Sequence, residues 1–376
     1  MTQKWQILNH AGSYVPFIMP ERLAMQSMMQ EMVGSGPFRF KADEHVSGSR
    51  LVYEKFVGYV PRPDGTPSQA AGPKRVFVDR VEWIVMPDPG TSTSALQSGE
   101  VDWWESPTAD LTGLLRANKN IVVEVLDPLG EIAIMRFNQR HAPFNDVAIR
   151  RALLGGVEQA DFMTVVAGDD RQFWKDHVGI YCPGTPFATD AGLEPLAGKR
   201  DPAKVAAILK EAGYAGQKIV FLTPADSPET AALSDVGADM LRRCGMAVDV
   251  QVSDLSTTMQ RRQSTEPERV AGWDCFITRF GSFDLSSPAT NLLLRGNGTS
   301  AWSGWPEDTE MENLRDRWFA AADPTAQAQL ATDIQRRAMQ TVPYIPLGQH
   351  LRQTAYRRRL SGMLKGLPLF WNIEKA

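Results

Sequence analysis

The pattern of apolar and polar residues first predicts a strand at Val78–Met86, where the two kinds alternate loosely and β-branched and aromatic side chains are frequent. A short helix follows, which Thr91 or Ser92 can cap and Ser98-Gly99 ends. Val101–Trp104 is mostly apolar and predicts a second strand. Because two strands joined by a helical crossover are normally parallel, this stretch predicts a βαβ unit.

Three side chains of this stretch are candidates for a ligand site. Parallel sheets bind ligands at the carboxyl ends of their strands, and this rule places Asp102, Trp104 and Glu105 near a cleft. A buried tryptophan and two solvated carboxylates explain the same residues. The pattern leaves both interpretations open.

Longer helices with clear N-caps are predicted in the second half of the chain. Asp201-Pro202 and Asp323-Pro324 both match the start of a helix. Thr230–Cys244 has one apolar face and lies between the apolar runs Lys218–Leu222 and Val248–Val252, which predicts a second βαβ unit. Further predicted strands are Phe38–Lys41, Leu51–Phe56, Ile121–Val125, Ile132–Phe137, Trp273–Phe280 and Tyr344–Leu347. Further predicted helices are Pro20–Met32, Asp110–Ala117, one capped by Asn145 or Asp146, Asp308–Ala321 and Pro324–Gln340.

The composition is that of a globular protein with a core of normal size. The chain has 376 residues, of which 43% are hydrophobic and 22% charged, and this length suggests two to three domains. A net charge of −4 argues against nucleic acid as a partner, since phosphate binding needs a basic face. We interpret the one basic cluster, Arg357–Arg359 with Arg352, as a solvated face.

The three cysteines, Cys182, Cys244 and Cys275, are far apart and have no zinc-ligand spacing. A disulfide between two of them stays open, and Cys244 and Cys275 fit small buried hydrophobic positions. No apolar run is long enough to span a membrane. The first residues, MTQKWQILNH, lack the long apolar core of a secretory signal.

Standard catalytic motifs are missing from the sequence: there is no G-x-S-x-G, P-loop or H-E-x-x-H pattern. The five histidines show no ligand spacing, so we expect no metal and no cofactor. Asp102 with Glu105, and Asp226 with Glu229, are carboxylate pairs, but neither has the surroundings of a general acid. A hydrolase that uses Asp102 and Glu105 is therefore a secondary hypothesis.

The segment from Arg279 to Asp284 contains the most specific candidate site. It follows a predicted strand and places a carboxylate, Asp284, among aromatic side chains. Phe280 and Phe283 can supply apolar walls and a cation–π contact to a cationic head group that Asp284 binds. Alternatively, Asp284 caps a turn, and composition alone favours neither reading.

Five stretches of the chain resemble a known family. They are GSGPFRF at 34–40, DRVEWIVMPDPGTSTSALQSGEVDWWE at 79–105, FNQRHAPFNDVAIRRALLGGV at 137–157, GWDCFITRFGSFDLSSP at 272–288 and VPYIPLGQHLRQTAYRRRLSG at 342–362. In this order they resemble the periplasmic solute-binding proteins of peptide and nickel ABC importers, family 5. The second and third stretches are specific as a pair.

The resemblance implies an α/β fold of the periplasmic-binding-protein type II, a two-lobed clamshell. Residues 1–134 would form part of lobe one, residues 135–347 lobe two, and residues 348–376 the return to lobe one. Ile132–Phe137 and Tyr344–Leu347 would be the crossing strands. The lobes would close over a peptide or small-molecule solute and deliver it to ABC permease subunits in the periplasm.

The resemblance also implies roles for particular residues. In peptide-binding members, a carboxylate in the segment of Asp284 takes the ligand's α-amino group, and Arg279, Phe280 and Phe283 would be its neighbours. The protein would be a monomer, without enzymatic activity. Nickel is not the expected cargo, because the histidines are scattered.

The chain departs from the family pattern at its start. Residues 1–13 do not resemble the family and contain neither a signal nor a lipid-anchor cysteine. We therefore expect an N-terminally truncated member with an incomplete lobe one, which would be cytoplasmic if Met1 is the true start. A ligand-sensing fragment that no longer takes part in transport is the alternative hypothesis.

Overall fold

The computed structural model describes residues 20–24, 31–68, 70–266 and 272–376. Within these ranges the chain forms two compact units, one from Leu129–Leu351 and the other from residues up to Pro128 together with Arg352–Ala376. The boundaries expected at 134 and 347 fall inside strands of the first unit. The sheets and core clusters of the two units are separate.

The first unit is built on a six-stranded sheet with the order β7-β11-β6-β10-β8-β9. Strands β8, β9 and β10 are parallel, while β6 is antiparallel to both of its neighbours, β10 and β11. The predicted βαβ unit at 218–252 is confirmed, because β8 and β9 pair in parallel on either side of helix α9. The strands are β6 Glu131–Phe137, β7 Trp174–Lys175, β8 Lys218–Pro224, β9 Ala247–Ser253, β10 Cys275–Gly281 and β11 Tyr344–His350.

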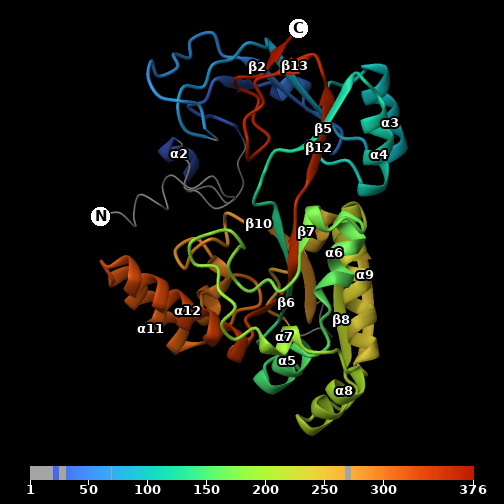
Figure 1. Ribbon diagram of the computed structural model, residues 1–376, viewed down its shortest axis with the longest axis vertical. Helices are drawn as coiled ribbons and strands as arrows, with labels where there is room; N and C mark the ends of the chain where they lie inside the picture. Colours follow the sequence, from blue (N-terminus) through green and yellow to red (C-terminus); the bar gives the residue numbers. More distant parts are fainter. Residues whose placement is uncertain (1–19, 25–30, 69, 267–271) are drawn as a thin grey trace. The chain divides into compact units, whose positions relative to one another are not determined.

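Helices α6 and α9 cover one face of this sheet and lie side by side (Figure 1). Helix α9 approaches the sheet closely at Gly237, where a Cβ atom would lie 2.6 Å from Cδ1 of Ile277. The predicted caps Asp201 and Asp323 each accept a hydrogen bond from a backbone amide in the first turn of their helix. Asp308, where a further helix was predicted to begin, caps α11 in the same way. The helices are α5 Val147–Leu154, α6 Gln159–Ala167, α7 Glu194–Ala197, α8 Pro202–Glu211, α9 Pro228–Arg243, α10 Leu255–Arg261, α11 Thr309–Ala320 and α12 Pro324–Thr341.

The opposite face of the sheet is covered by tryptophan rings and by the segment 287–308. Trp273, Trp302 and Trp305 pack with Phe276 of β10. Arg136, fully buried in β6, holds this segment by donating hydrogen bonds to the backbone carbonyls of Leu293, Trp302 and Ser303, and it also donates to the carbonyl of Pro343 before β11. Burial lowers the pKa of Arg136 to about 9, because the charged form loses its water.

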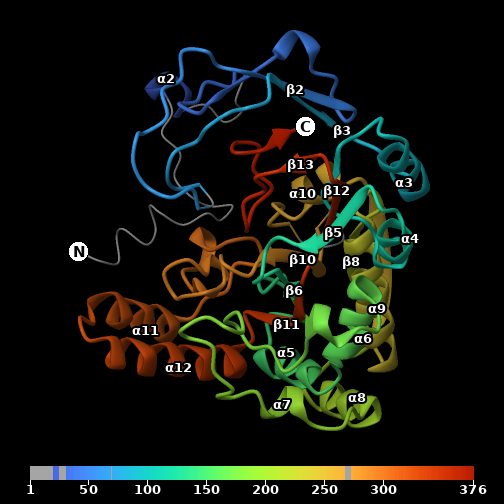
Figure 2. The ribbon, with the colours of Figure 1, turned by 45° about the horizontal axis from the view of Figure 1, so that its top comes forward.

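The second unit contains three small sheets, ordered β1-β2-β3, β4-β12-β5 and β13-β14, all antiparallel. Strand β12 lies beside β5 with helix α4 nearby (Figure 2). The strands are β1 Phe38–Phe40, β2 Arg50–Lys55, β3 Arg80–Ile84, β4 Trp103–Trp104, β5 Ile121–Val125, β12 Gln353–Arg357, β13 Leu360–Ser361 and β14 Glu374–Lys375. The helices are α2 Glu21–Ala24, α3 Pro89–Ser98 and α4 Thr112–Ala117.

The βαβ unit predicted at 78–104 is wrong. Strand β3 pairs with β2, whereas β4 pairs with β12 in a different sheet, so helix α3 connects two sheets. Only two residues of β4 pair, and their partner comes from the end of the chain, which a local pattern cannot reveal. The cap of α3 is Asp88, whose Oδ1 accepts from the amide of Thr91 at 2.7 Å, and not Thr91 or Ser92.

Three further expectations from sequence concern the helix at 20–32, the cysteines and membrane-spanning helices. Of the helix predicted at 20–32, the structure describes α2 and the non-helical residues 31–32, while residues 25–30 lie outside the described part. All three cysteines are buried and free. In the described part of the chain, no helix combines the length and the apolar character needed to cross a bilayer.

Candidate functional site

One edge of the six-stranded sheet brings together the carboxyl ends of four strands. Because β8, β9, β10 and β11 point the same way and β6 runs opposite to them, this edge also carries the first residue of β6. His350 ends β11, Gly281 ends β10, and Glu131 begins β6, so all three lie at this edge. Ligands of α/β proteins bind at such an edge.

Asp284 lies in a turn directly after β10. The turn is closed by the amide of Asp284, which donates to the carbonyl of Gly281 at 2.8 Å. The amide of Ser282 connects the turn to the residue before β6 by donating to the carbonyl of Gly130, also at 2.8 Å. The Asp284 side chain is folded back, since a Cβ atom on Gly281 would lie 3.4 Å from its Oδ2. With 5% of its surface exposed, Asp284 is a buried carboxylate at the carboxyl edge.

Arg279 joins two other carboxylates near this edge. Its Nη1 lies 2.7 Å from Oε2 of Glu131, at the start of β6, and also contacts Oε2 of Glu229, in the first turn of α9. These three side chains are 16%, 20% and 19% exposed, respectively. Poor access to water makes such pairs stronger than ion pairs on an open surface, and removal of one partner correspondingly more costly.

His350 belongs to the same group and was not expected from sequence. Its Nε2 lies 3.6 Å from Oε2 of Glu131, and side-chain ligand atoms of Glu131, Glu229 and His350 all lie within 4.8 Å of one another. These are metal-ligand types, but the guanidinium of Arg279 already provides the cation between the two carboxylates. Because the members come from three elements that are far apart in the chain, no sequence spacing could have indicated them.

Strand alternation separates Arg279 from Phe280. Arg279 faces helix α9 through Glu229, whereas Phe280 lies on the opposite face, where its ring packs edge-on against Trp302 with centroids 5.5 Å apart. Phe280 is 7% exposed and belongs to the core, and Phe283, in the turn, is half-buried. Of the two aromatic candidates, Phe283 therefore lies in the same turn as Asp284. Phe280 packs on the face of the sheet opposite Arg279 and stabilises β10 there.

Asp102 lies in the second unit, in an ion-pair cluster. Its Oδ1 is 2.5 Å from Nη2 of Arg359 and its Oδ2 is 2.7 Å from Nζ of Lys375, which ties the start of β4 to β13 and β14. Burial alone would raise the pKa of Asp102, but the bonds from Lys375 and Arg359 outweigh it and lower that pKa below its ordinary value. A general acid needs a raised pKa, so this geometry does not fit the hydrolase hypothesis.

Of the arginines near the C-terminus, Arg358 and Arg359 are exposed, as expected from sequence, but the cluster also makes hydrogen bonds to other parts of the chain. Arg357 donates to the carbonyls of Leu96 and Gln97 at the end of α3, and Arg358 to the carbonyl of Lys119. Arginines at helix ends satisfy carbonyls that have no partner within the helix. The cluster therefore binds the chain to itself.

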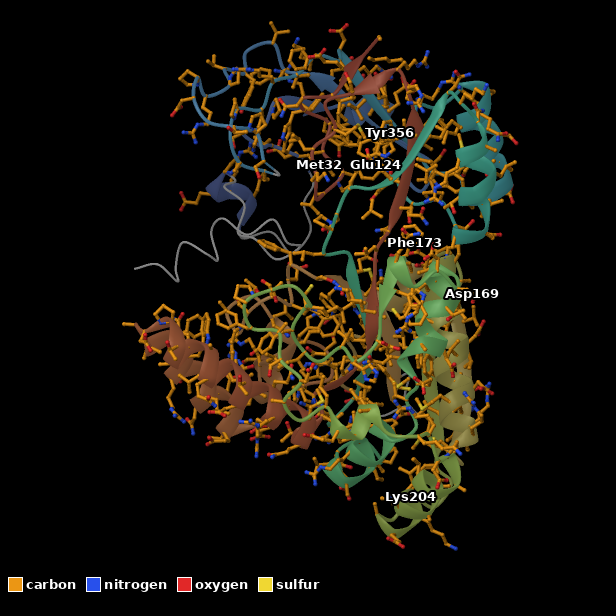
Figure 3. All side chains as sticks on the ribbon, viewed as in Figure 1. Met32, Glu124, Asp169, Phe173, Lys204 and Tyr356 are labelled. Carbon is orange, nitrogen blue, oxygen red and sulfur yellow. The ribbon has the colours of Figure 1, made fainter. Side chains whose placement is uncertain are left out.

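In the sheet β4-β12-β5, a side-chain hydrogen bond joins strands β12 and β5. Figure 3 shows Tyr356 of β12 beside Glu124 of β5, and the tyrosine hydroxyl donates to Oε1 of Glu124. Burial and this carboxylate both raise the pKa of Tyr356. The hydroxyl stays protonated as a donor, which fits a structural role for the pair.

Comparison with known proteins assigns the chain to a protein family. The family model described as "Bacterial extracellular solute-binding proteins, family 5 Middle" matches residues 10–302. The probable peptide ABC transporter periplasmic-binding protein y4tO of Sinorhizobium fredii is 35% identical over 367 residues, which are 96% of this chain and 69% of that protein.

Solved structures show the same fold. DppA of Helicobacter pylori, in complex with the peptide STSA, superposes with a TM-score of 0.71 at 18% identity, over 91% of this chain and 63% of that one. AgaA of A. tumefaciens R10, in complex with agropinic acid, gives 0.72 at 16% identity, over 91% and 67%. The fold is thus that of the two-lobed periplasmic binding proteins, and the chain belongs to the bacterial extracellular solute-binding proteins of family 5.

Proposed function

We propose that this chain, the substrate-binding component of an ABC importer, binds a peptide-like solute in the periplasm and delivers it as a monomer to the permease. The observation that carries the choice of solute is the buried carboxylate of Asp284 at the carboxyl edge of the sheet. The names of the relatives support it, since y4tO is called a probable peptide transporter protein and DppA was solved with a peptide.

Asp284 would bind the α-amino group of the solute. A buried carboxylate accepts strong charge-assisted hydrogen bonds from an ammonium group, and a shielded site makes this attraction larger than in water. Phe283, half-buried in the same turn, would contribute an apolar wall or a cation–π contact, while Phe280 holds β10 from its other face. Binding of the amino end in this way leaves the rest of the peptide to other pockets.

No catalytic role is proposed. Family 5 solute-binding proteins are binding proteins and not enzymes, and we extend this to the present chain. The carboxylate considered for hydrolysis, Asp102, is held ionised by two basic partners. A solute of the opine type stays the competing ligand class, because AgaA was solved with agropinic acid.

Calorimetry with the tetrapeptide Ser-Thr-Ser-Ala and with agropinic acid tests the proposal. We expect the peptide to bind, its N-acetylated form to bind about a hundredfold more weakly, and Asp284→Ala or Asp284→Asn to cause a similar loss, since a buried charge loses its partner. Asp239→Ala, which removes an exposed carboxylate of α9, is the control and should leave the affinity unchanged.

Two results would contradict the proposal in different ways. Unchanged peptide affinity in both Asp284 variants would remove this carboxylate from the site while leaving the solute class intact. Binding of agropinic acid without any binding of the peptide would replace the solute class.

A further inference from the structure

We propose that Arg279 is a positioning residue for solute binding, which fixes the turn that carries Asp284 by joining Glu131 and Glu229, and which does not itself contact the solute. This inference rests on the proposed function, because it assigns a role in the same site. It changes the part expected of Arg279 from a contact residue to a support.

The first step of the argument is that Arg279 connects three elements through one nitrogen. Arg279 lies in β10, and its Nη1 contacts the carboxylate of Glu131 at the start of β6 and that of Glu229 in the first turn of α9. The positive guanidinium therefore compensates the negative charges of both carboxylates. Its side chain faces α9, and 16% of it is exposed, so little of its surface is available to a ligand.

The second step leads from Glu131 to Asp284. Glu131 is the direct cross-strand partner of Gly281, and the neighbouring Gly130 accepts the hydrogen bond from Ser282. The carboxylate of Asp284 lies against Gly281, 3.4 Å from where a Cβ atom would be. A shift at the start of β6 is therefore passed to the turn and to the carboxylate that it positions.

The third step is what happens without the guanidinium. A carboxylate oxygen of Glu131 and one of Glu229 lie within 4.8 Å of each other and of a ring nitrogen of His350. Without the guanidinium between them, the two carboxylates repel each other and tend to separate. Separation moves the start of β6 away from α9 and so displaces the turn.

A double-mutant cycle with Ser-Thr-Ser-Ala tests this inference by calorimetry. Arg279→Gln should weaken binding about tenfold in the parent chain, which is within the usual range for coupled neighbours. The same change should cause no further loss in Asp284→Asn, because its effect passes through Asp284. Arg243→Gln, which breaks an exposed pair on α9, is the matched control and should leave affinity unchanged.

A second variant protects the test against a failure to fold. Glu229→Gln keeps the Arg279–Glu131 pair but releases α9, and it should weaken binding in the same direction by a smaller factor. Arg279→Lys retains the charge at this position and should restore part of the affinity lost in Arg279→Gln.

The possible results separate this inference from the proposed function. Losses that add in the double variant would mean that Arg279 contacts the solute independently and would overturn the positioning role. A lower melting temperature with unchanged affinity would also overturn it, because the role would be structural alone. If the parent chain does not bind the peptide, the proposed function fails, and this inference fails with it.

Discussion

Asp308 illustrates how one carboxylate can serve two elements of the first unit. Its Oδ1 caps helix α11 through the amide of Met311 at 3.1 Å, and Arg337 of α12 holds both oxygens, with contacts of 2.7 and 2.9 Å. Burial alone would raise the pKa of Asp308, but Arg337 and the helix amide outweigh it and lower the pKa below its ordinary value of 3.8. The ionised form is therefore favoured in the folded state.

The stability that this ionised form provides should depend on pH. Because the folded pKa lies below 3.8, the contribution is complete above that value and is lost as the pH falls through the lower, folded pKa. At pH 7 we expect Asp308→Asn to lower the free energy of unfolding by about 2 kcal/mol, through the loss of the ion pair. Urea denaturation at pH 7 and at about pH 3 should show this difference shrinking in acid.

The control for this change is Asp323→Asn. Asp323 caps α12 in the same way but is exposed, and asparagine caps a helix almost as well as aspartate. It should cost only a few tenths of a kcal/mol at either pH. An equal loss in both variants, or a pH-independent loss in Asp308→Asn, would contradict the role given to the Arg337 pair.

At the scale of elements, Gly130, the residue before β6, lies very close to the end of β11. This glycine has a φ of +62°, and a Cβ atom on it would lie 2.1 Å from the carbonyl oxygen of His350. An oxygen of the main chain cannot move aside as the end of a side chain can. Gly130 is thus required for two reasons, a left-handed backbone and a close approach.

Replacement by alanine should separate these two reasons. We expect Gly130→Ala to lower the free energy of unfolding by more than about 3 kcal/mol, since it must push two paired strands apart. Gly184→Ala is the matched control, because Gly184 also has a positive φ of +87° but no atom within 4 Å of its Cβ position. It should cost only about 1 kcal/mol, and equal losses in thermal unfolding of the two variants would exclude the close approach as a cause.

The sequence predicted the elements whose signals are local. The Asp-Pro starts of α8 and α12 and the alternating pattern of β9 are set by residues within one or two turns, and the structure confirms them. The pairing of β4 with β12 depends on residues at the far end of the chain, so the local pattern suggested a βαβ unit instead.

The same distinction applies to the candidate site. Asp284 could be selected from its position just past a predicted strand, which is a local signal. The group of Glu131, Glu229 and His350 around Arg279 forms only when three strands and a helix are assembled, and alternation places Phe280 on the other face. The roles of the predicted site residues stay predictions until binding is measured.

At the scale of the whole molecule, the two units differ in how the chain supplies them. Every strand of the six-stranded sheet lies between Glu131 and His350, and its large core cluster is drawn from the same range. The other unit needs two separate segments, because β12 from the end of the chain lies between β4 and β5.

The continuous unit should therefore fold alone. We expect the fragment Leu129–Leu351 to show near-UV circular dichroism and cooperative thermal unfolding, because removal of the rest breaks no strand pairing of its sheet. A fragment from Leu129 to Val342 lacks β11, which pairs with both β6 and β7, and should not fold cooperatively. A disordered longer fragment would show that the sheet depends on the other unit.

The late position of β12 has a consequence for synthesis on the ribosome. The sheet that carries Asp284 is fully translated once Leu351 has been added, whereas β4 and β5 must wait for Arg352–Ala376 before they gain the strand between them. A premature stop codon just after Leu351 would spare the unit completed first. The loss would instead affect the other unit, although most of that unit is encoded at the beginning of the message.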